Sequence, residues 1–127
     1  MNTMLISFLL GLLAAAVTIV VIAVLVIGVK WLKKYVIEKL RNREKHKVAF
    51  ADTREIVDEY IAQKVDAADE ISMDDLEKMC AKTPYVAAIV DDETGEITDY
   101  EGIKAEETDA NFKARMKQQK GMIIIGA

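Results

Sequence analysis

The sequence predicts an α+β protein with one N-terminal transmembrane helix, followed by a basic helical collar and a small three-stranded antiparallel or mixed sheet packed with about three helices. Three observations predict this class: a long apolar segment without charge, a basic run directly after it, and an acidic remainder in which helical and strand patterns alternate. They divide the chain into a transmembrane helix (residues 1–29, spanning about 4–29), a basic collar (residues 30–47) and an acidic module (residues 48–127).

The apolar segment, residues 4–29, contains no charged residue, and its only polar side chains are Ser7 and Thr18. A helix of this length measures about 39 Å and can cross a hydrocarbon core of about 30 Å. Its second half is rich in β-branched residues, but in lipid the backbone satisfies its hydrogen bonds within a helix. A cleaved signal peptide is the rival interpretation, and it is disfavoured because residues 1–8 carry no basic side chain.

The charges that flank this segment predict its orientation. The collar holds eight Lys or Arg and two acids, whereas residues 1–3 carry no charged side chain. The positive-inside rule therefore predicts a single-pass protein of the plasma (inner) membrane, with the N-terminus outside and the C-terminal module in the cytoplasm. The residues expected to anchor the helix at the membrane interface are Lys30, Trp31, Lys33, Lys34 and Tyr35.

One pattern inside the apolar segment has a functional interpretation. Ser7, Gly11 and Ala15 recur every four residues, and small residues at this spacing let two membrane helices approach closely. This stripe predicts helix pairing and a homo-oligomer. The alternative is that small residues fall at this spacing by chance.

The collar continues as a helix in this prediction, because Leu32, Val36 and Leu40 lie on one face and no Gly or Pro interrupts it. Its eight basic residues either contact anionic lipid headgroups or only determine topology. The acidic module has 19 acids and 9 bases. It would be repelled by an anionic bilayer, fold back on the collar, or dock on basic partners, and it argues against nucleic-acid binding.

Two helices are expected at the start of the acidic module. An apolar stripe predicts the first over about Thr53–Ala67, either separate from the collar or continuous with it. Ser72 begins the second, since Ser72 and Asp75 approximate a capping box, and Pro84 ends it.

Strands and a third helix follow. The apolar run Tyr85–Val90 predicts a strand buried on both faces, and a turn with Gly95 joins it to an edge strand over Glu96–Tyr100 that ends before Gly102. A helix from about Thr108 to Gln119 leads to a third strand at Met122–Ile125. We expect this last strand beside Tyr85–Val90, which would then be central.

Catalytic and metal-binding patterns are not found, so no enzymatic activity, cofactor or metal is predicted. Cys80 is expected to be a small core thiol and His46 a surface imidazole, with a catalytic pair between them as a remote alternative. The acids of the hairpin Asp91–Glu101 miss the EF-hand pattern, because Gly95 falls at a ligand position. We interpret them as a solvated hairpin tip, with a weak cation site as the alternative.

The function predicted from these features is that of a membrane-anchored interaction or assembly module with an unidentified protein partner. Anchoring would raise the concentration of the acidic module near membrane partners. The first alternative is a small membrane-active effector, holin-like or inhibitory, that acts through oligomers of the transmembrane helix. The second is a membrane-tethered enzyme or ligand sensor.

Overall fold

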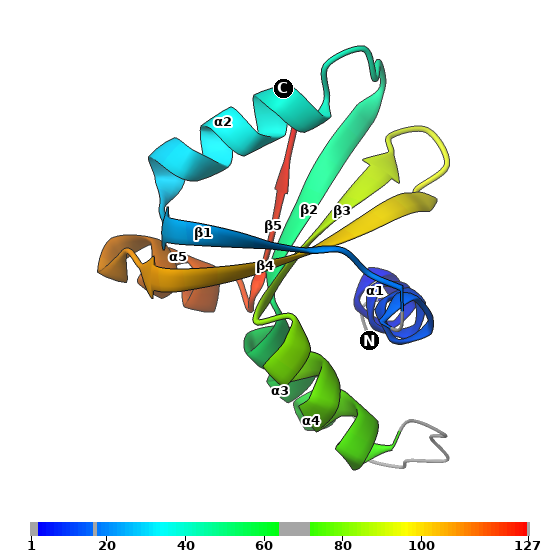
Figure 1. Ribbon diagram of the computed structural model, residues 1–127. Coiled ribbons are helices and arrows are strands. Elements are labelled where there is room, and N and C mark those ends of the chain that lie inside the picture. Colours follow the sequence, from blue (N-terminus) through cyan, green and yellow to red (C-terminus); the bar gives the residue numbers. More distant parts are fainter. Residues whose placement is uncertain (1–2, 17, 64–71, 127) are drawn as a thin grey trace.

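The computed structural model describes residues 3–16, 18–63 and 72–126, which form five helices and one five-stranded sheet (Figure 1). In chain order the elements are α1 (Thr3–Ala15), β1 (Val21–Ile27), α2 (Val29–Lys39), β2 (His46–Asp52), α3 (Thr53–Gln63), α4 (Met73–Lys82), β3 (Tyr85–Asp91), β4 (Ile97–Thr108), α5 (Ala110–Gln118) and β5 (Met122–Ile125).

The sheet is mixed, and its strand order is β1-β4-β3-β2-β5. β1 runs parallel to β4, and the other three neighbouring pairs are antiparallel. β3 lies in the middle, which agrees with the burial of Tyr85–Val90 along its whole length. β1 and β5 are the two edge strands.

The apolar segment of residues 4–29 is not one helix. α1 ends at Ala15, and Val21–Ile27 is an extended strand. Within the described residues, no helix combines the length and the apolar character needed to cross a membrane. The predicted transmembrane helix, with the single-pass plasma-membrane location and orientation derived from it, is therefore wrong, and so is the prediction of three strands and about three helices.

Hydrogen bonds from β4 and from Asp109, the residue after it, explain why the second half of this segment is a strand. β-branched side chains favour extended backbone wherever a neighbouring strand satisfies the peptide groups. The amide of Gly102 donates to the carbonyl of Val20 and the amide of Asp109 to that of Ile27, both at 2.8 Å. The prediction assumed that lipid surrounds this segment. In lipid, a single segment can satisfy its backbone hydrogen bonds only as a helix.

The collar is a helix only in its first part. α2 ends at Lys39, and Asn42 and Lys45 adopt positive φ angles of 64° and 59° in the turn that follows. β2 then begins at His46, so the helix over residues 30–47 and its possible continuation into α3 are also wrong. The apolar run Val48–Ala51 in β2 is completely buried.

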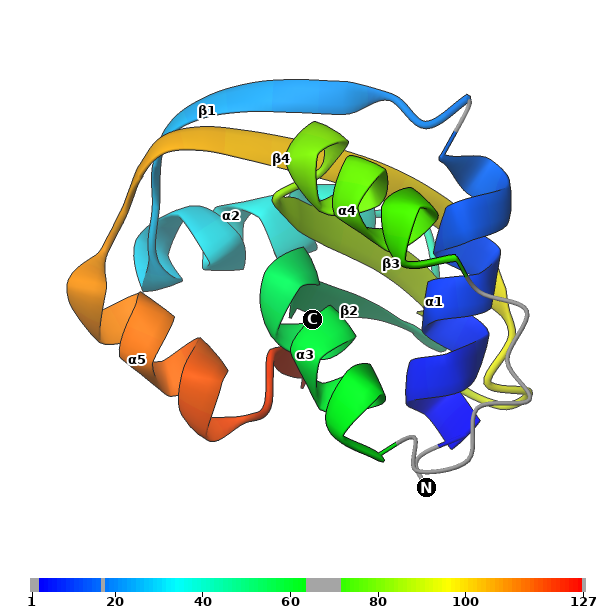
Figure 2. The same cartoon turned by 90° about the horizontal axis from the view of Figure 1, so that it is seen from below.

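Helices cover both faces of the sheet (Figure 2). α2 and α5 pack on one face, where Phe50 is completely buried. The ring centroid of Phe50 lies 5.9 Å from Trp31, 5.7 Å from Tyr85 and 6.0 Å from Phe112. α1, α3 and α4 contribute to the core on the other face. Phe8, Leu9 and Leu12 of α1 are completely buried.

Local features predicted in the acidic module agree with the structure more closely than those predicted for the apolar segment and the collar. The Ser72 hydroxyl caps α4 by accepting a hydrogen bond from the amide of Asp75 (3.4 Å), and Gly95 has a φ of 73° in the turn between β3 and β4. Both features are confirmed. The strand at Met122–Ile125 is confirmed as well, but it pairs with β2 and not with β3.

Two boundaries in the module differ from the prediction. β4 runs through Gly102 to Thr108, where it pairs with β1. Gly102 does not break the strand but allows close packing, since a Cβ there would lie 2.7 Å from Cγ2 of Thr83. Asp109, not Thr108, caps α5, since its carboxylate accepts from the amide of Phe112 at 3.0 Å. The predicted end of the α3 helix, near Ala67, lies outside the described residues.

Substitution of Gly11 tests the packing of α1 on β4. A Cβ at Gly11 would overlap the hydroxyl of Tyr100, which donates to the carbonyl of Phe8 at 3.1 Å. Alanine is better than glycine in a helix by about 1 kcal/mol, yet we expect Gly11→Ala to lower the free energy of unfolding by about 1 kcal/mol through this clash and lost hydrogen bond. In a Tyr100→Phe background the same change should be neutral or stabilising. A urea double-mutant cycle measures the coupling, and additive effects would show that α1 does not pack here.

Candidate functional site

The outer side of β1 is the most unusual surface of the protein. One side of β1 pairs with β4, from Val21 opposite Gly102 to Ile27 opposite Thr108. On its other side, no described strand pairs with it. Figure 2 shows β1 along the margin of the sheet with no element beyond it. A row of backbone amides and carbonyls is therefore left without strand partners.

The side chains at this edge are apolar. Val20 is 64% exposed and Leu25 71%, and Val21 and Val26 are exposed as well. No charged residue or proline occurs between residues 4 and 29. Proteins ordinarily protect edge strands with charges, prolines, bulges or short length. β5, at the opposite edge, has only four residues. β1 has seven residues and none of these protections, so it is suited to pair with another strand.

The two faces of β1 differ. Ile22 and Val24 are partly buried against the α2 side of the sheet. Ala23 and Leu25 alternate with them and are exposed. From Ile22 to Leu25, one face of the strand therefore packs against the core and the other is exposed, whereas Ile27 at the end of the strand is completely buried.

The five predicted membrane-anchoring residues all lie on α2 but separate into two groups. Lys30, Lys33 and Lys34 are exposed and form no ion pair with any described residue. Trp31 and Tyr35 instead pack into the protein, with their rings stacked at a centroid distance of 4.9 Å. The aromatic pair is part of the core of this face.

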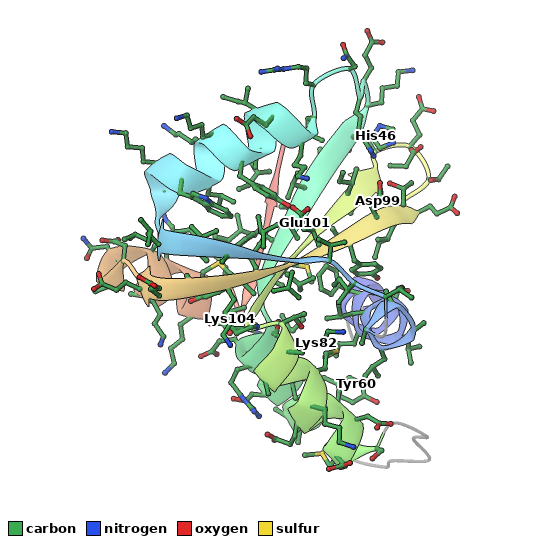
Figure 3. The ribbon with its side chains drawn as sticks, in the orientation of Figure 1. His46, Tyr60, Lys82, Asp99, Glu101 and Lys104 are labelled. Carbon is green, nitrogen blue, oxygen red and sulfur yellow. The ribbon has the colours of Figure 1, made fainter. Side chains whose placement is uncertain are left out.

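Tyr35 takes part in a polar cluster beneath α2. Its hydroxyl donates to Oε1 of Glu101 at 2.5 Å, and Lys39 Nζ lies 3.2 Å from the same carboxylate. Figure 3 shows Glu101 on the α2 side of β4. Burial, followed by the hydrogen bond to Glu101, raises the pKa of Tyr35 far above its usual value. The phenol therefore stays protonated and ties α2 to β4.

The predicted helix-pairing stripe also lies against the rest of the chain. Gly11 faces the ring of Tyr100, whose pKa is raised to about 12 by burial. Ala15 is partly buried and Ser7 is exposed. At Gly11, the central position of the stripe, the small residue therefore permits a close approach to Tyr100 of the same chain.

The second half of the collar pairs with the acidic hairpin Asp91–Glu101. Of the alternatives that the sequence left open for the acidic module, the structure shows folding back on the collar. The ion pairs are Arg43–Asp99 (3.1 Å), Lys45–Glu93 (2.8 Å) and Lys47–Asp92 (2.9 Å). Exposed pairs of this kind contribute about 0–1 kcal/mol each. They hold the hairpin and the turn before β2 together, as the positions of His46 and Asp99 in Figure 3 illustrate.

Within the described part of the chain, ion pairs or hydrogen bonds engage five of the six hairpin carboxylates, all except that of Glu96. The carboxylate of Asp91 accepts from the amides of Thr94 (3.1 Å) and Glu93 (2.8 Å), and these hydrogen bonds lower its pKa. Among the residues that the structure describes, no cluster of three or more His, Cys, Asp or Glu side chains is arranged to hold a metal ion.

A polar cleft of about 460 Å³ lies where α3, α4 and α5 meet the ends of the strands. Asp52 and Cys80 line it, each 8% exposed, and burial raises the pKa of both side chains. Asp52 caps the start of α3 by accepting from the amide of Glu55 at 3.3 Å. His46 lies at the opposite end of β2, so it forms no catalytic pair with Cys80.

Sequence reasoning missed the β1 edge. The sequence feature that could have indicated this strand is the β-branched run in the second half of the apolar segment. Such a run is as typical of a strand as of a membrane helix. Comparison of the chain with models of protein families, with curated proteins and with solved structures finds no match in any of the three.

Proposed function

We propose that this protein is an assembly module that binds a second copy of itself by antiparallel pairing of the two β1 edges. The observation that carries the proposal is the free side of β1, seven residues long, apolar and without charge. Addition of a strand to such an edge satisfies backbone hydrogen bonds and buries side chains at the same time. Two copies would form one continuous ten-stranded sheet.

The sequence of β1 favours a second copy as the occupant. Val-Ile-Ala-Val-Leu-Val-Ile is aliphatic throughout, so when it is reversed about Val24 each Val opposes an Ile, or the Ala opposes the Leu. In an antiparallel pair centred there, Val24 lies opposite Val24 of the partner subunit. At each of the remaining positions one aliphatic side chain lies opposite another. A two-fold contact requires a surface that is complementary to itself, and this strand meets that requirement.

The chemistry of the edge supports the same choice. Val20, Leu25 and Val26 are apolar and at least about half exposed. They offer no charge with which to select a basic or acidic peptide. Pairing with a second copy covers these side chains with equivalent ones, and the cations of α2 begin only at Lys30, beyond the strand.

Disulfide crosslinking at the two-fold axis tests the proposal. In a Cys80→Ala background, Val24→Cys places two thiols opposite each other across the antiparallel pair, at a separation that a disulfide can bridge. We expect mild oxidation to convert most of this variant to a crosslinked dimer under native conditions, and sedimentation to give a dimer before oxidation.

Val26→Cys is the matched control. In the proposed register Val26 faces Ile22 of the partner subunit, so two Val26→Cys chains should not crosslink, whereas a mixture with Ile22→Cys chains should. Equal crosslinking of the Val24→Cys and Val26→Cys variants, or a monomer at high micromolar concentration, would contradict the proposal.

A further inference from the structure

We propose that a groove between α2, α5 and β5 binds the acyl chain and head group of a single-chain amphipathic carboxylate, such as a fatty acid. The groove has a volume of about 400 Å³ and is lined by no residue of β1, so its lining does not require pairing of the β1 edges. Figure 1 shows α2 and α5 on the same side of the sheet. The residues that line it are Val29, Leu32, Lys33, Phe112, Arg115, Gln119, Ile123 and Ile125.

The floor of the groove is apolar. Leu32 and Phe112 are core residues, 4% and 1% exposed, whose surfaces form its bottom. Ile123 and Ile125 of β5 are partly buried beside them, and Val29 at the rim is 42% exposed. An alkyl chain would displace water from this floor and gain contact along its length.

The rim of the groove is cationic. Lys33 and Arg115 are exposed and form no ion pair with any described residue. No Asp or Glu lines the groove, although the chain as a whole carries a net charge of −4. Two unpaired cations above an apolar floor complement a ligand that has an anionic head and an apolar tail.

The dimensions favour one chain over a bilayer surface. A volume of about 400 Å³ lies near the lower end of small-molecule sites, which run from roughly 300 to 1,000 Å³. The apolar floor is recessed between two helices, so an inserted alkyl chain can reach it. The broad plane of head groups at a membrane surface does not fit into such a recess. The ligand class is therefore a monomeric long-chain carboxylate.

Titration calorimetry with dodecanoate below its micellar concentration tests this assignment. We expect saturable binding of dodecanoate, with butyrate and dodecanol each at least about tenfold weaker, since one lacks the tail and the other the charge. Lys33→Gln combined with Arg115→Gln should weaken dodecanoate binding by about tenfold. Lys117→Gln, an exposed cation in the same last turn of α5 that does not line the groove, is the matched control and should change nothing.

Three calorimetric results would each overturn the inference. They are the absence of saturable dodecanoate binding, dodecanol binding as tightly as dodecanoate, and equal losses in the double variant and the Lys117→Gln control. A parallel arm uses vesicles with phosphatidylglycerol. If the double substitution abolishes vesicle binding and leaves dodecanoate binding intact, the cations recognise a membrane surface and the fatty-acid site is wrong.

Discussion

Replacing Phe50 by alanine is expected to lower the free energy of unfolding by about 3–5 kcal/mol. Phe50 is completely buried in β2, and its ring contacts the rings of Trp31, Tyr85 and Phe112 from three different elements. Its removal leaves a cavity between the sheet and the helices α2 and α5, and these neighbours cannot collapse into it without distorting the sheet. A small domain has a total stability of about 5–15 kcal/mol, so this substitution alone would bring it close to unfolding.

Chemical denaturation followed by circular dichroism measures the effect. Phe50→Leu keeps most of the buried volume and should cost less than half as much. Ile61→Ala, at an α3 position that is 40% exposed, should change the unfolding free energy by no more than about 0.5 kcal/mol. A loss below 1 kcal/mol for Phe50→Ala would show that β2 does not occupy the middle of this core.

Features of the acidic module that depend on near neighbours in the chain could be predicted from the sequence. The cap at Ser72, the buried run that begins at Tyr85 and the turn at Gly95 are each determined within a few residues by hydrogen bonding or by backbone conformation. The pairing of β5 with β2 could not be predicted in this way, because β2 itself was not predicted: it crosses the boundary that the prediction drew between the collar and the acidic module.

The N-terminal half was misassigned because its conformation depends on a distant segment. An apolar, β-branched run without charge fits either a membrane helix or an edge strand, and local pattern does not distinguish them. The deciding groups are the amides of Gly102 and Asp109, which lie about 80 residues further along the chain and bond to the ends of β1. The prediction treated residues 4–29 as one element, and it did not consider that the segment could divide into a helix and a strand.

The functional residues were predicted from the same assignment of this segment to a membrane. Because the segment was assigned to lipid, its β1 part was not considered as a surface for a protein partner. Tyr35 was predicted at a membrane interface, but its burial and its hydrogen bond to Glu101 place it in the core. Lys33 remains exposed, as expected for an anion contact, but Phe112 and Ile123 beside it could only be found in three dimensions.

Placing lysine at both Ala23 and Leu25 is expected to weaken self-association by at least about a hundredfold. In the antiparallel pair centred on Val24, Ala23 lies opposite Leu25 of the partner subunit. The double substitution therefore sets lysines directly opposite one another twice across the interface, and like charges in that position repel. Lysine is also the residue with which natural edge strands prevent pairing. Both side chains are exposed, so the fold should be retained.

The charge-swapped variant, Ala23→Lys with Leu25→Glu, makes this prediction specific to the proposed register. It introduces the same number of charged side chains, but each lysine now faces a glutamate, so sedimentation equilibrium should show the dimer restored while the lysine pair stays monomeric. Circular dichroism should be the same for both. If both variants are equally monomeric, the charge or polarity of the edge matters and the register is wrong. If both remain dimeric, the contact lies elsewhere. Only the antiparallel pairing centred on Val24 predicts that one double variant is a monomer and the other a dimer, although the two differ only at residue 25.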